Sequence, residues 1–291
     1  MVGPSEDDVQ LLGAVRIREL AAELNLRPTK QRGQNFVVDA NTVRRIVALA
    51  NVASDDVVLE VGPGLGSLTL GLLPKVQQVI AVEIDDVLAG ALPKTISEQA
   101  PTLVNRLQII NADALQVNSL AQEPSALVAN LPYNVSVPVL LHLLATFESI
   151  TKVLVMVQSE VADRLAAPSG SRVYGIPSVK ARWFGNVTRV GSVGTKVFWP
   201  QPRVDSGLIC ITREPVITTQ ASREDVFAVV DAAFAQRRKT LRSTLASWAG
   251  SRELVDEILL EAGVDPALRG EALNVLDFAN IAVAKKRRIG T

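Results

Sequence analysis

The chain has 291 residues, of which 48% are hydrophobic and 21% are charged, and its formal net charge is zero. This composition is sufficient for one large hydrophobic core and a small second domain, and no apolar stretch approaches the length that crosses a bilayer. With one histidine and one cysteine, the chain is poorly suited to zinc hydrolysis, to a serine-histidine-aspartate triad or to an internal disulfide, so we expect no metal site and no membrane partner.

The N-terminal segment is predicted to be an extension of the main fold. Residues 1–8 are acidic and lack the charged-then-apolar pattern of a secretion signal, which favours a cytoplasmic protein. Apolar spacing predicts a helix around Leu11 to Leu24. We assign residues 1–28 to the extension, residues 29–214 to a large α/β domain and residues 215–291 to a small helical domain, with a linker that begins around Arg213.

Strands and helices are predicted to alternate from Asn41 to about Ala167, which favours a mostly parallel sheet with helices on both faces. The first strand of this region, Asp56 to Val61, runs into Gly62-Pro63-Gly64-Leu65-Gly66 and then into a helix. Glycines at such a turn let the backbone approach a ligand closely. Ser67 stands where the dinucleotide fingerprint has a glycine, and Pro63 lacks a backbone donor, so pyrophosphate is the poorer candidate ligand.

The next strands each lead to a polar residue. The strand from Gln78 ends in Glu83, about twenty residues past the glycines, where a ribose diol would lie; Glu83 is therefore the predicted nucleoside anchor. The strand Leu107 to Ile110 leads to Asp113, whose carboxylate can accept the amino group of an adenine ring. The fourth strand leads to Asn130. Because the carboxyl ends of parallel strands meet at one edge, we expect these side chains to share a crevice.

The tetrapeptide Asn130-Leu131-Pro132-Tyr133 suits the methylation of an amine on a planar ring. Such an amine is a poor nucleophile because its lone pair is delocalised. The Asn130 side-chain carbonyl and the Leu131 backbone carbonyl can each accept one N–H and direct the lone pair toward a methyl donor. Pro132 stiffens the turn, and Tyr133 offers a face on which an unstacked base can lie. Taken alone, the tetrapeptide is also compatible with an ordinary strand-to-loop turn.

Two changes in secondary structure are predicted in the C-terminal half. From Gly185 to Thr212 it is rich in Val, Gly and Pro, which favours antiparallel strands at the sheet edge, with Phe198 to Pro202 as a loop that reaches back to the crevice. Beyond the linker, helical spacing and glycine or proline stops predict helices. Their expected ranges are 225–234, 238–248, 252–261 and 273–284.

Together, these motifs resemble those of S-adenosylmethionine-dependent RNA adenine N6-dimethyltransferases, and specifically the bacterial enzymes of the small ribosomal subunit. The resemblance extends from about Thr29 almost to the end of the chain. It includes further runs of sequence, namely Gly33-Gln34-Asn35-Phe36, Phe198-Trp199-Pro200-Gln201-Pro202-Arg203-Val204-Asp205-Ser206 and Ala235-Gln236-Arg237-Arg238-Lys239-Thr240-Leu241-Arg242. It implies a Rossmann-like methyltransferase sheet followed by a small all-helical domain that contacts RNA.

The resemblance also implies an activity and a set of site residues. The expected reaction is dimethylation of the N6 amines of two adjacent adenosines in a 3′-terminal hairpin of 16S rRNA within the small subunit, with a role in subunit biogenesis. The donor is S-adenosylmethionine, with no metal. Phe198 resembles the aromatic residue that holds the target adenine against Tyr133. By similarity, the cofactor site is lined by Asn35, Val37, Gly62, Gly64, Glu83, Asp113 and Asn130.

Two comparisons favour the small subunit. The related antibiotic-resistance enzymes of 23S rRNA tend to have Asn at the position of Asp205 and usually lack the basic run that begins at Arg237. One departure is Ser159, because the family usually has a lysine there, and its absence removes a plausible phosphate contact. A 23S rRNA methyltransferase, a DNA or protein amine methyltransferase and a non-catalytic assembly factor remain as alternatives.

Charge is distributed unevenly along the chain. Residues 54–160 contain 4 basic and 11 acidic residues, a balance of −7, so the rest of the neutral chain is at +7. Basic flanks around an acidic cofactor region favour an RNA partner. We expect a monomer whose candidate phosphate contacts are Arg237, Arg238, Lys239, Arg242, Lys30 and Arg32, with the run Lys285 to Arg288 as a further candidate.

Overall fold

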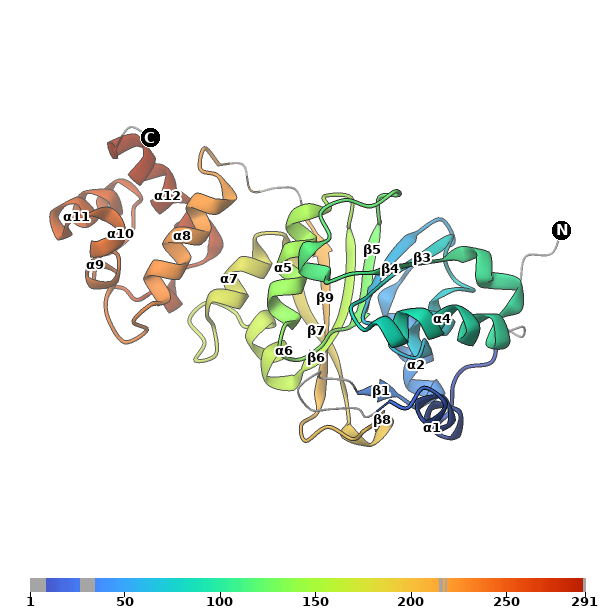
Figure 1. The fold of residues 1–291 in the computed structure, drawn as a ribbon. Coiled ribbons are helices and arrows are strands. Elements are labelled where there is room, and N and C mark those ends of the chain that lie inside the picture. The colour runs from blue at the N-terminus through green and yellow to red at the C-terminus, as the bar shows by residue number, and fades with distance from the viewer. Residues whose placement is uncertain (1–8, 27–34, 215–216, 218, 290–291) are drawn as a thin grey trace. The chain divides into compact units, whose positions relative to one another are not determined.

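The computed structural model describes residues 9–26, 35–214, 217 and 219–289. The chain is divided by its contacts into two compact units, Met1–Ala162 with Thr188–Arg213 and Asp163–Val187 with Glu214–Thr291. Each unit has its own hydrophobic core. Figure 1 shows the labelled elements.

The first unit contains the helices and strands that the sequence predicts to alternate. Its elements up to β6 are α1 (Ala14–Glu23), β1 (Phe36–Val37), α2 (Ala40–Ala50), β2 (Val57–Val61), α3 (Ser67–Leu72), β3 (Gln78–Glu83), α4 (Asp86–Gln99), β4 (Leu107–Asn111), β5 (Ala126–Asn130), α5 (Ser136–Thr146) and β6 (Lys152–Gln158). Short 3-10 helices lie at Pro101–Arg106, Ala114–Gln116 and Thr195–Val197. The helix α6 (Ser159–Ala166) ends in the second unit, and the strand β7 (Gly185–Val193) begins there. The first unit is completed by β8 (Phe198–Trp199) and β9 (Ser206–Arg213).

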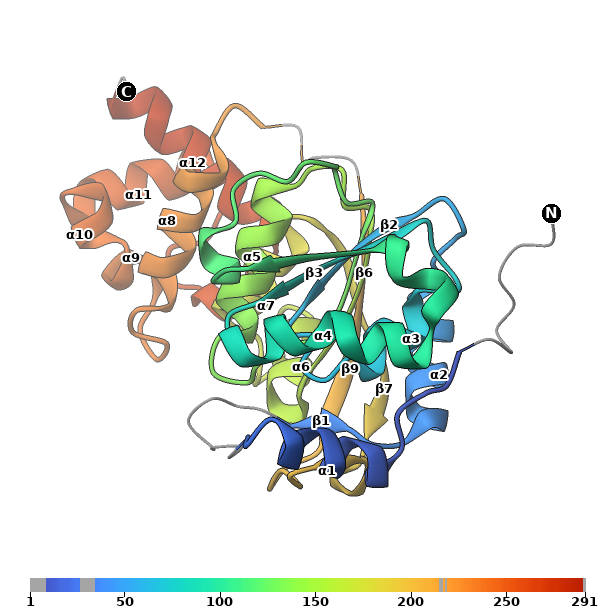
Figure 2. The same cartoon turned by 45° about the vertical axis from the view of Figure 1, so that its right-hand side comes forward.

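Within the described residues, the main sheet has seven strands in the order β4-β3-β2-β5-β6-β9-β7. The pairs from β4 to β6 are parallel, and β9 pairs with β6 in the antiparallel sense. The chain order reverses between β2 and β5, which is the point where open α/β sheets form a ligand crevice. The predicted α/β fold, with antiparallel pairing at its edge, is confirmed. The helix α4 crosses in front of the strands in Figure 2.

Local sequence explains why these elements form. All five residues of β2 are buried, as expected for a central parallel strand. The side chain of Asp39 caps α2 by accepting the backbone N–H of Thr42 at 2.7 Å. Asp85 caps α4 in the same way, because its carboxylate accepts the N–H groups of Val87 and Leu88. Since Asp85 lies two residues after the end of β3, this cap fixes the chain at the edge of the ligand crevice.

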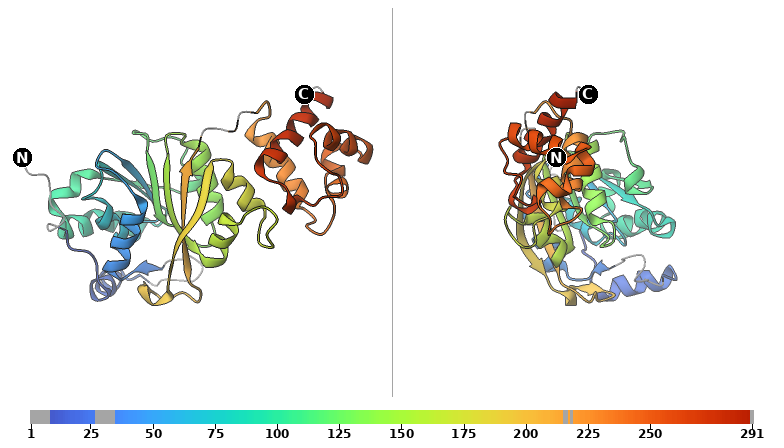
Figure 3. Two further views of the ribbon diagram at one scale, coloured as in Figure 1. Left: turned by 180° about the vertical axis from the view of Figure 1, so that it is seen from behind. Right: turned by 90° about the vertical axis from the view of Figure 1, so that its left-hand side faces the viewer.

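A two-stranded antiparallel ribbon is the second sheet among the described residues. It pairs Phe36 with Trp199 and Val37 with Phe198, which joins the start of the domain to the loop before β9. The rings of Phe36 and Trp199 stack with centroids 6.3 Å apart. Figure 3, seen from behind, shows the blue β1 near the yellow segment that contains β8. The segment around Phe198 is therefore paired with backbone that lies next to the crevice.

The second unit is helical. Its elements are α7 (Ile176–Arg182), α8 (Arg223–Phe234), α9 (Leu241–Thr244), α10 (Ala246–Ala249), α11 (Arg252–Glu261), a 3-10 helix at Gly270–Ala272 and α12 (Val275–Ile289). The predicted helix at 238–248 is wrong in detail, because α9 and α10 are separate. The backbone N–H groups of Leu241 and Arg242 bond to the carbonyls of Leu268 and Pro266 instead of continuing a helix from α8.

Residues 163–187 pack with the C-terminal helices, although the sequence-based boundary at residue 214 places them in the α/β domain. Tyr174 is fully buried, and its ring contacts that of Phe234 with centroids 6.2 Å apart. Trp183 meets Phe227 at the same distance, and Lys180 pairs with Asp231. These contacts join residues 163–187 to residues that follow position 213, although residues 188–213 between them belong to the first unit. A single boundary in the sequence cannot describe this arrangement. None of the described helices combines the length and apolar content of a membrane span.

Candidate active site

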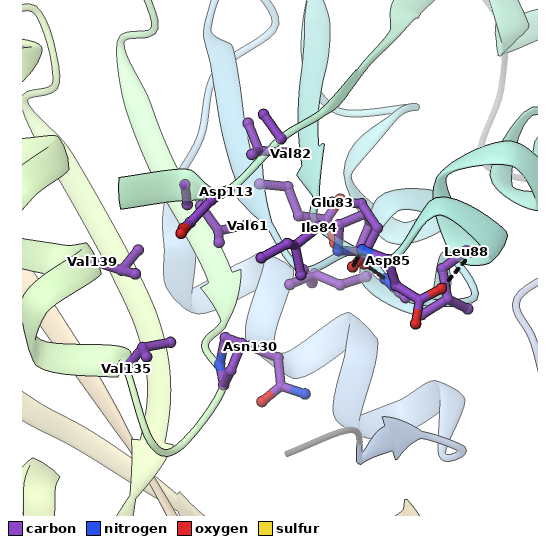
Figure 4. Close-up of a pocket in the computed structure, with 18 of the residues that line it drawn as sticks. Val61, Val82, Glu83, Ile84, Asp85, Leu88, Asp113, Asn130, Val135 and Val139 are labelled. Atoms are coloured by element: carbon purple, nitrogen blue, oxygen red, sulfur yellow. Dashed lines mark hydrogen bonds between the residues drawn. The ribbon is translucent and has the colours of Figure 1, made fainter. Parts of the chain in front are cut away.

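A cavity of about 620 Å³ lies at the carboxyl ends of β2, β3 and β5. Its volume is within the range of pockets that hold small organic ligands. Figure 4 shows Glu83, Asp113 and Asn130 around this cavity. The structure brings together all the predicted cofactor-binding residues, since each of them lines the cavity: Asn35, Val37, Gly62, Gly64, Glu83, Asp113 and Asn130.

The glycine loop after β2 forms one wall of the cavity. Gly62, Gly64 and Gly66 have φ values of 67°, 58° and 95°. This left-handed region is costly for residues with a side chain. At Gly64 a Cβ atom would also lie 2.9 Å from the ring of Phe36. The loop therefore requires glycine for both its backbone conformation and its packing.

Glu83 is held at the end of β3 by the backbone of this loop. Its carboxylate accepts the N–H of Gly64 at 3.1 Å and that of Asp85 at 3.0 Å. The residue is only 5% exposed, and burial raises the pKa of its carboxyl. Both contacts fix the carboxylate at the cavity wall, in the position predicted for a ribose anchor.

Asp113 lies at the end of the neighbouring strand and lines the same cavity. One of its oxygens accepts the N–H of Leu115 at 2.9 Å, which begins the short 3-10 helix after β4. Asn111 donates its side-chain amide to the carbonyl of Glu83 at 2.9 Å. The segments that carry Glu83 and Asp113 are thus tied to each other.

Glu60 is a cavity-lining carboxyl to which the sequence assigns no role. It is 1% exposed and accepts the hydroxyl of Thr69 at 2.7 Å. Burial raises the pKa of Glu60 to about 8, and the nearby Glu83 carboxylate contributes in the same direction. The sequence does contain a signal for Glu60, namely an acid in an apolar strand just before the glycine loop.

Asn130 is the last residue of β5, and its side chain is oriented by a distant backbone group. Its Nδ2 atom donates to the carbonyl oxygen of Asn35 at 3.1 Å. The next peptide is fixed as well, because the N–H of Leu131 donates to the carbonyl of Met156 at 3.1 Å. Pro132 lines the cavity beside Asn130. These contacts hold the start of the Asn-Leu-Pro-Tyr turn at the cavity.

The two predicted base-stacking rings do not line the cavity in this structure. Phe198 is 4% exposed and belongs to the hydrophobic core of the first unit. The hydroxyl of Tyr133 lies 2.9 Å from Oγ of Ser206, and burial raises the pKa of this phenol. Leu131 is buried and also does not line the cavity. Of the tetrapeptide, Asn130 and Pro132 therefore line the cavity, whereas Leu131, Tyr133 and the more distant Phe198 do not.

The predicted RNA contacts in the second unit have different environments. Arg237 donates to Glu271 at 3.1 Å, and Arg242 forms a two-pronged pair with Asp256, with a shortest distance of 2.7 Å. The side chains of Arg238 and Lys239 are exposed in the turn after α8. Lys30 and Arg32 lie outside the described residues. Two of the predicted contacts are thus held by acidic partners within the unit.

The strand order and the position of the cavity define an open α/β protein with a ligand site at the carboxyl ends of its strands. The chain is similar in structure to a dimethyladenosine transferase from Plasmodium falciparum, with a TM-score of 0.72 and 22% identity over 87% of this chain and 97% of that one. It is also similar to the 23S rRNA methyltransferase ErmE, with a TM-score of 0.63 and 26% identity over 86% of this chain and 99% of that one.

At the level of sequence, the chain belongs to the ribosomal RNA adenine dimethylase family, whose model matches residues 25–285. A relative named ribosomal RNA small subunit methyltransferase A from Streptomyces avermitilis is 64% identical, covering 97% of this chain and 96% of the relative. A relative of the same name from Thermobifida fusca is 60% identical, covering 94% and 96%. The predictions of the family, of the fold class and of enzymatic activity on ribosomal RNA are confirmed.

Proposed function

We propose that this enzyme transfers methyl groups from S-adenosylmethionine to the N6 amines of two adjacent adenosines in a 3′-terminal hairpin of 16S rRNA within the small ribosomal subunit. The observation that carries the proposal is the placement of Asn130. Its amide is oriented by Asn35 at the wall of the cavity that Glu83 and Asp113 also line. The names of the relatives at 60% identity and above support the small subunit as the substrate.

The residues of the cavity suit the nucleoside part of the donor. Glu83 presents a buried carboxylate for a ribose diol, and Asp113 presents an acceptor for an adenine amino group. The glycine loop allows close approach of backbone to the ligand. When bound, the donor supplies an electrophilic methyl group on a sulfonium.

The Asn-Leu-Pro-Tyr turn positions and polarises the target amine. Because Nδ2 of Asn130 is engaged by Asn35, the side-chain oxygen is the atom that accepts one amine N–H. The carbonyl of Leu131 accepts the other, and the bond from its N–H to Met156 keeps the peptide in place. The lone pair is then directed at the methyl carbon. No strong base is needed, because the methylated amine loses its proton to water.

Dimethylation places a second demand on the site. After the first transfer the amine retains one N–H, so either Asn130 or Leu131 loses its partner. The base must then be held by stacking, which is the role proposed for Tyr133 and Phe198. Since Phe198 is buried in the ribbon with Val37, we propose that the loop around it rearranges when RNA binds.

A second candidate substrate is the large-subunit RNA, because the solved 23S rRNA methyltransferase shares the fold at 26% identity. The two substrates are separated by one experiment. The purified protein is incubated with labelled methyl donor and with unmethylated small subunits, large subunits and the corresponding naked RNAs, and the modified nucleotides are mapped.

We expect label only in the small-subunit RNA, as dimethylation of two neighbouring adenosines near its 3′ end. Label in 23S rRNA, or none in either subunit, would overturn the proposal. We further propose that the enzyme acts as a monomer in the cytoplasm without a metal. Sedimentation of the purified protein tests the monomeric state, and activity in the presence of a chelator tests the independence from metal.

A further inference from the structure

The first residue of α3 uses its hydroxyl outside the helix. Ser67 stands where the dinucleotide fingerprint has its third glycine, and the residue is only 7% exposed. Its hydroxyl donates to the backbone carbonyl of Val37 at 2.7 Å. Both residues line the cavity. Helix α3 is therefore tied to the ribbon strand β1 by a buried hydrogen bond at the cavity wall.

The carbonyl that accepts this bond is directed away from its partner strand in the ribbon. The N–H of Val38 donates to the carbonyl of Val197 at 2.8 Å, which flanks the pair between Val37 and Phe198. In an antiparallel pair that is flanked in this way, the two paired residues direct their own N–H and C=O groups outward. The Val37 carbonyl therefore meets the hydroxyl of Ser67, and a buried bond of this kind is costly to lose.

Three consecutive residues of this segment contact three different parts of the site. The carbonyl of Asn35 accepts Nδ2 of Asn130 at 3.1 Å. The ring of Phe36 lies against the glycine loop, since a Cβ atom at Gly64 would be 2.9 Å from it. Val37 is paired with β8 in the ribbon. The segment 35–37 therefore connects the Asn-Leu-Pro-Tyr turn, the glycine loop and the ribbon.

The position of the Asn35 carbonyl depends on the backbone that carries it. Peptide groups are planar, and β1 is paired at both Phe36 and Val37, so this short segment moves as a unit. The bond from Ser67 holds one end of the segment, and the carbonyl that orients Asn130 is at the other end. A catalytic group that is misplaced by about 1 Å can lose about 100-fold in rate.

We propose that Ser67 is a positioning residue for methyl transfer. Its hydroxyl holds the segment 35–37 where the Asn35 carbonyl engages Nδ2 of Asn130, so that the side-chain oxygen of Asn130 is presented to the target amine. This role rests on the proposed function, because the reaction in which Asn130 acts is the one proposed above. The orientation of the Asn130 amide itself does not depend on any substrate.

The test compares Ser67→Ala with the matched control Ser178→Ala. Ser178 also has a buried hydroxyl that donates to a backbone carbonyl, that of Arg164, but it belongs to the second unit and does not line the cavity. Alanine is a good helix former, so Ser67→Ala retains α3. Single-turnover methyl transfer to unmethylated small subunits, donor affinity and melting temperature are measured for both variants and for the wild type.

A fourth measurement follows the Asn130 amide directly and needs no RNA. The side-chain amide signal of Asn130 in isotope-labelled protein is assigned in nuclear magnetic resonance spectra by its absence from Asn130→Ala. The rate at which its bonded hydrogen exchanges with solvent is then compared among the proteins. A hydrogen-bonded amide exchanges more slowly than a free one, so this rate reports the bond to Asn35.

We expect Ser67→Ala to lower single-turnover transfer by about 10-fold to 100-fold. Its donor affinity should change little, and its exchange at Asn130 should be faster than in the wild type. Ser178→Ala should lower the melting temperature, because it also loses a buried bond, while its transfer and its exchange at Asn130 stay at wild-type values.

Wild-type transfer in Ser67→Ala would overturn this role. A loss of donor affinity as large as the loss of transfer would also refute it, because Ser67 would then act as a donor contact. The same holds for reduced transfer with wild-type exchange at Asn130, since the effect would not pass through the amide. If the wild-type protein modifies no small subunits, the proposed function fails, whereas the exchange rates still decide whether Ser67 holds the Asn130 amide.

Discussion

The side chain of Asn130 is oriented by a residue that is distant in sequence. Its Nδ2 group is bonded to the carbonyl of Asn35, 95 positions away. With the nitrogen engaged, the side-chain oxygen remains as the acceptor for an amine. The type of residue needed for this chemistry is visible in the sequence, but its orientation depends on a contact between two segments that only folding brings together.

Replacing Asn130 by Ala should reduce methyl transfer by roughly 100-fold or more, because one polarising acceptor is lost. Donor affinity should fall far less, since Glu83 and Asp113 remain in the cavity. The measurement is single-turnover transfer to small subunits together with donor binding by calorimetry. The matched control is Asn118→Ala, at an exposed asparagine that does not line the cavity. Equal turnover of both variants would contradict the assigned role.

The raised pKa of Glu60 predicts that the folding stability of the protein depends on pH. Its pKa is raised by burial from 4.5 to about 8 in the folded protein. Between these values the folded state binds a proton that the unfolded state releases, so folding stability falls as pH rises through this window. The greatest slope from one such group is about 1.4 kcal/mol per pH unit.

Replacing Glu60 by Gln removes this titration, so the variant should gain stability relative to wild type between pH 5 and pH 8. Denaturant unfolding at the two pH values measures the difference. The control is Glu123→Gln, which removes an exposed carboxylate that does not line the cavity. A Glu60→Gln difference that is the same at both values would show that Glu60 is ionised in the folded state.

At the scale of elements, the loop between β2 and α3 shows why glycine is required. Gly64 has a φ of 58°, and a Cβ atom there would lie 2.9 Å from Phe36. Phe36 in turn stacks on Trp199 in the ribbon. A side chain at Gly64 therefore disturbs both the glycine loop and the ribbon that adjoins the cavity.

Replacing Gly64 by Ala should destabilise the protein by about 1–3 kcal/mol, from backbone strain and overpacking. It should also weaken donor binding, because the N–H of Gly64 fixes Glu83. The control is Gly90→Ala in α4, where the Cβ atom meets nothing within 4 Å. That change should stabilise the helix by about 0.5–1 kcal/mol. The paired measurements are thermal unfolding and donor affinity, and similar stability of the two variants would contradict the strain.

The ribbon also shows a limit of prediction from sequence. The predicted Phe198 to Pro202 loop begins with the strand β8, whose Phe198 pairs with Val37, a residue that lines the cavity. The burial of the Phe198 ring follows from packing against residues of the core and not from any pattern near position 198. A sequence motif therefore indicates where a segment lies in the fold. The environment of its side chains depends on the other segments that pack against it.

At the scale of the whole molecule, the second unit is assembled from two stretches of the chain. Its core combines Tyr174 and Val179 with side chains of α8, α11 and α12. A protein that ends at residue 214 should therefore expose these apolar side chains and aggregate, although the sequence alone suggests a domain boundary there. Light scattering and thermal unfolding test this, with a chain that ends at Ala284 as the control. A monomeric 1–214 protein with wild-type melting temperature would contradict the assembly.

The basic turn after α8 gives a prediction about RNA affinity. Arg238 and Lys239 are exposed, whereas Arg237 and Arg242 pair with Glu271 and Asp256. Replacing Arg238 and Lys239 by Gln should lower the salt slope of subunit binding by about 2. The matched pair Arg237→Gln with Arg242→Gln should change it less, because each arginine already has an acidic partner. Equal slopes in the two double variants would contradict this division.

The sequence alone determined which segments form buried strands and which polar residues stand at their ends. Apolar runs specify buried strands, and parallel strands bring Glu83, Asp113 and Asn130 to one edge regardless of loop detail. Tertiary structure alone decided the burial of Phe198, the partners of Arg237 and Arg242, and the bond from Ser67 to the carbonyl of Val37. The physical reason is the distance in sequence between the residues involved. Strand patterns arise from neighbouring residues. Hydrogen bonds and ion pairs instead depend on which distant side chains the packed core places within about 3 Å of one another.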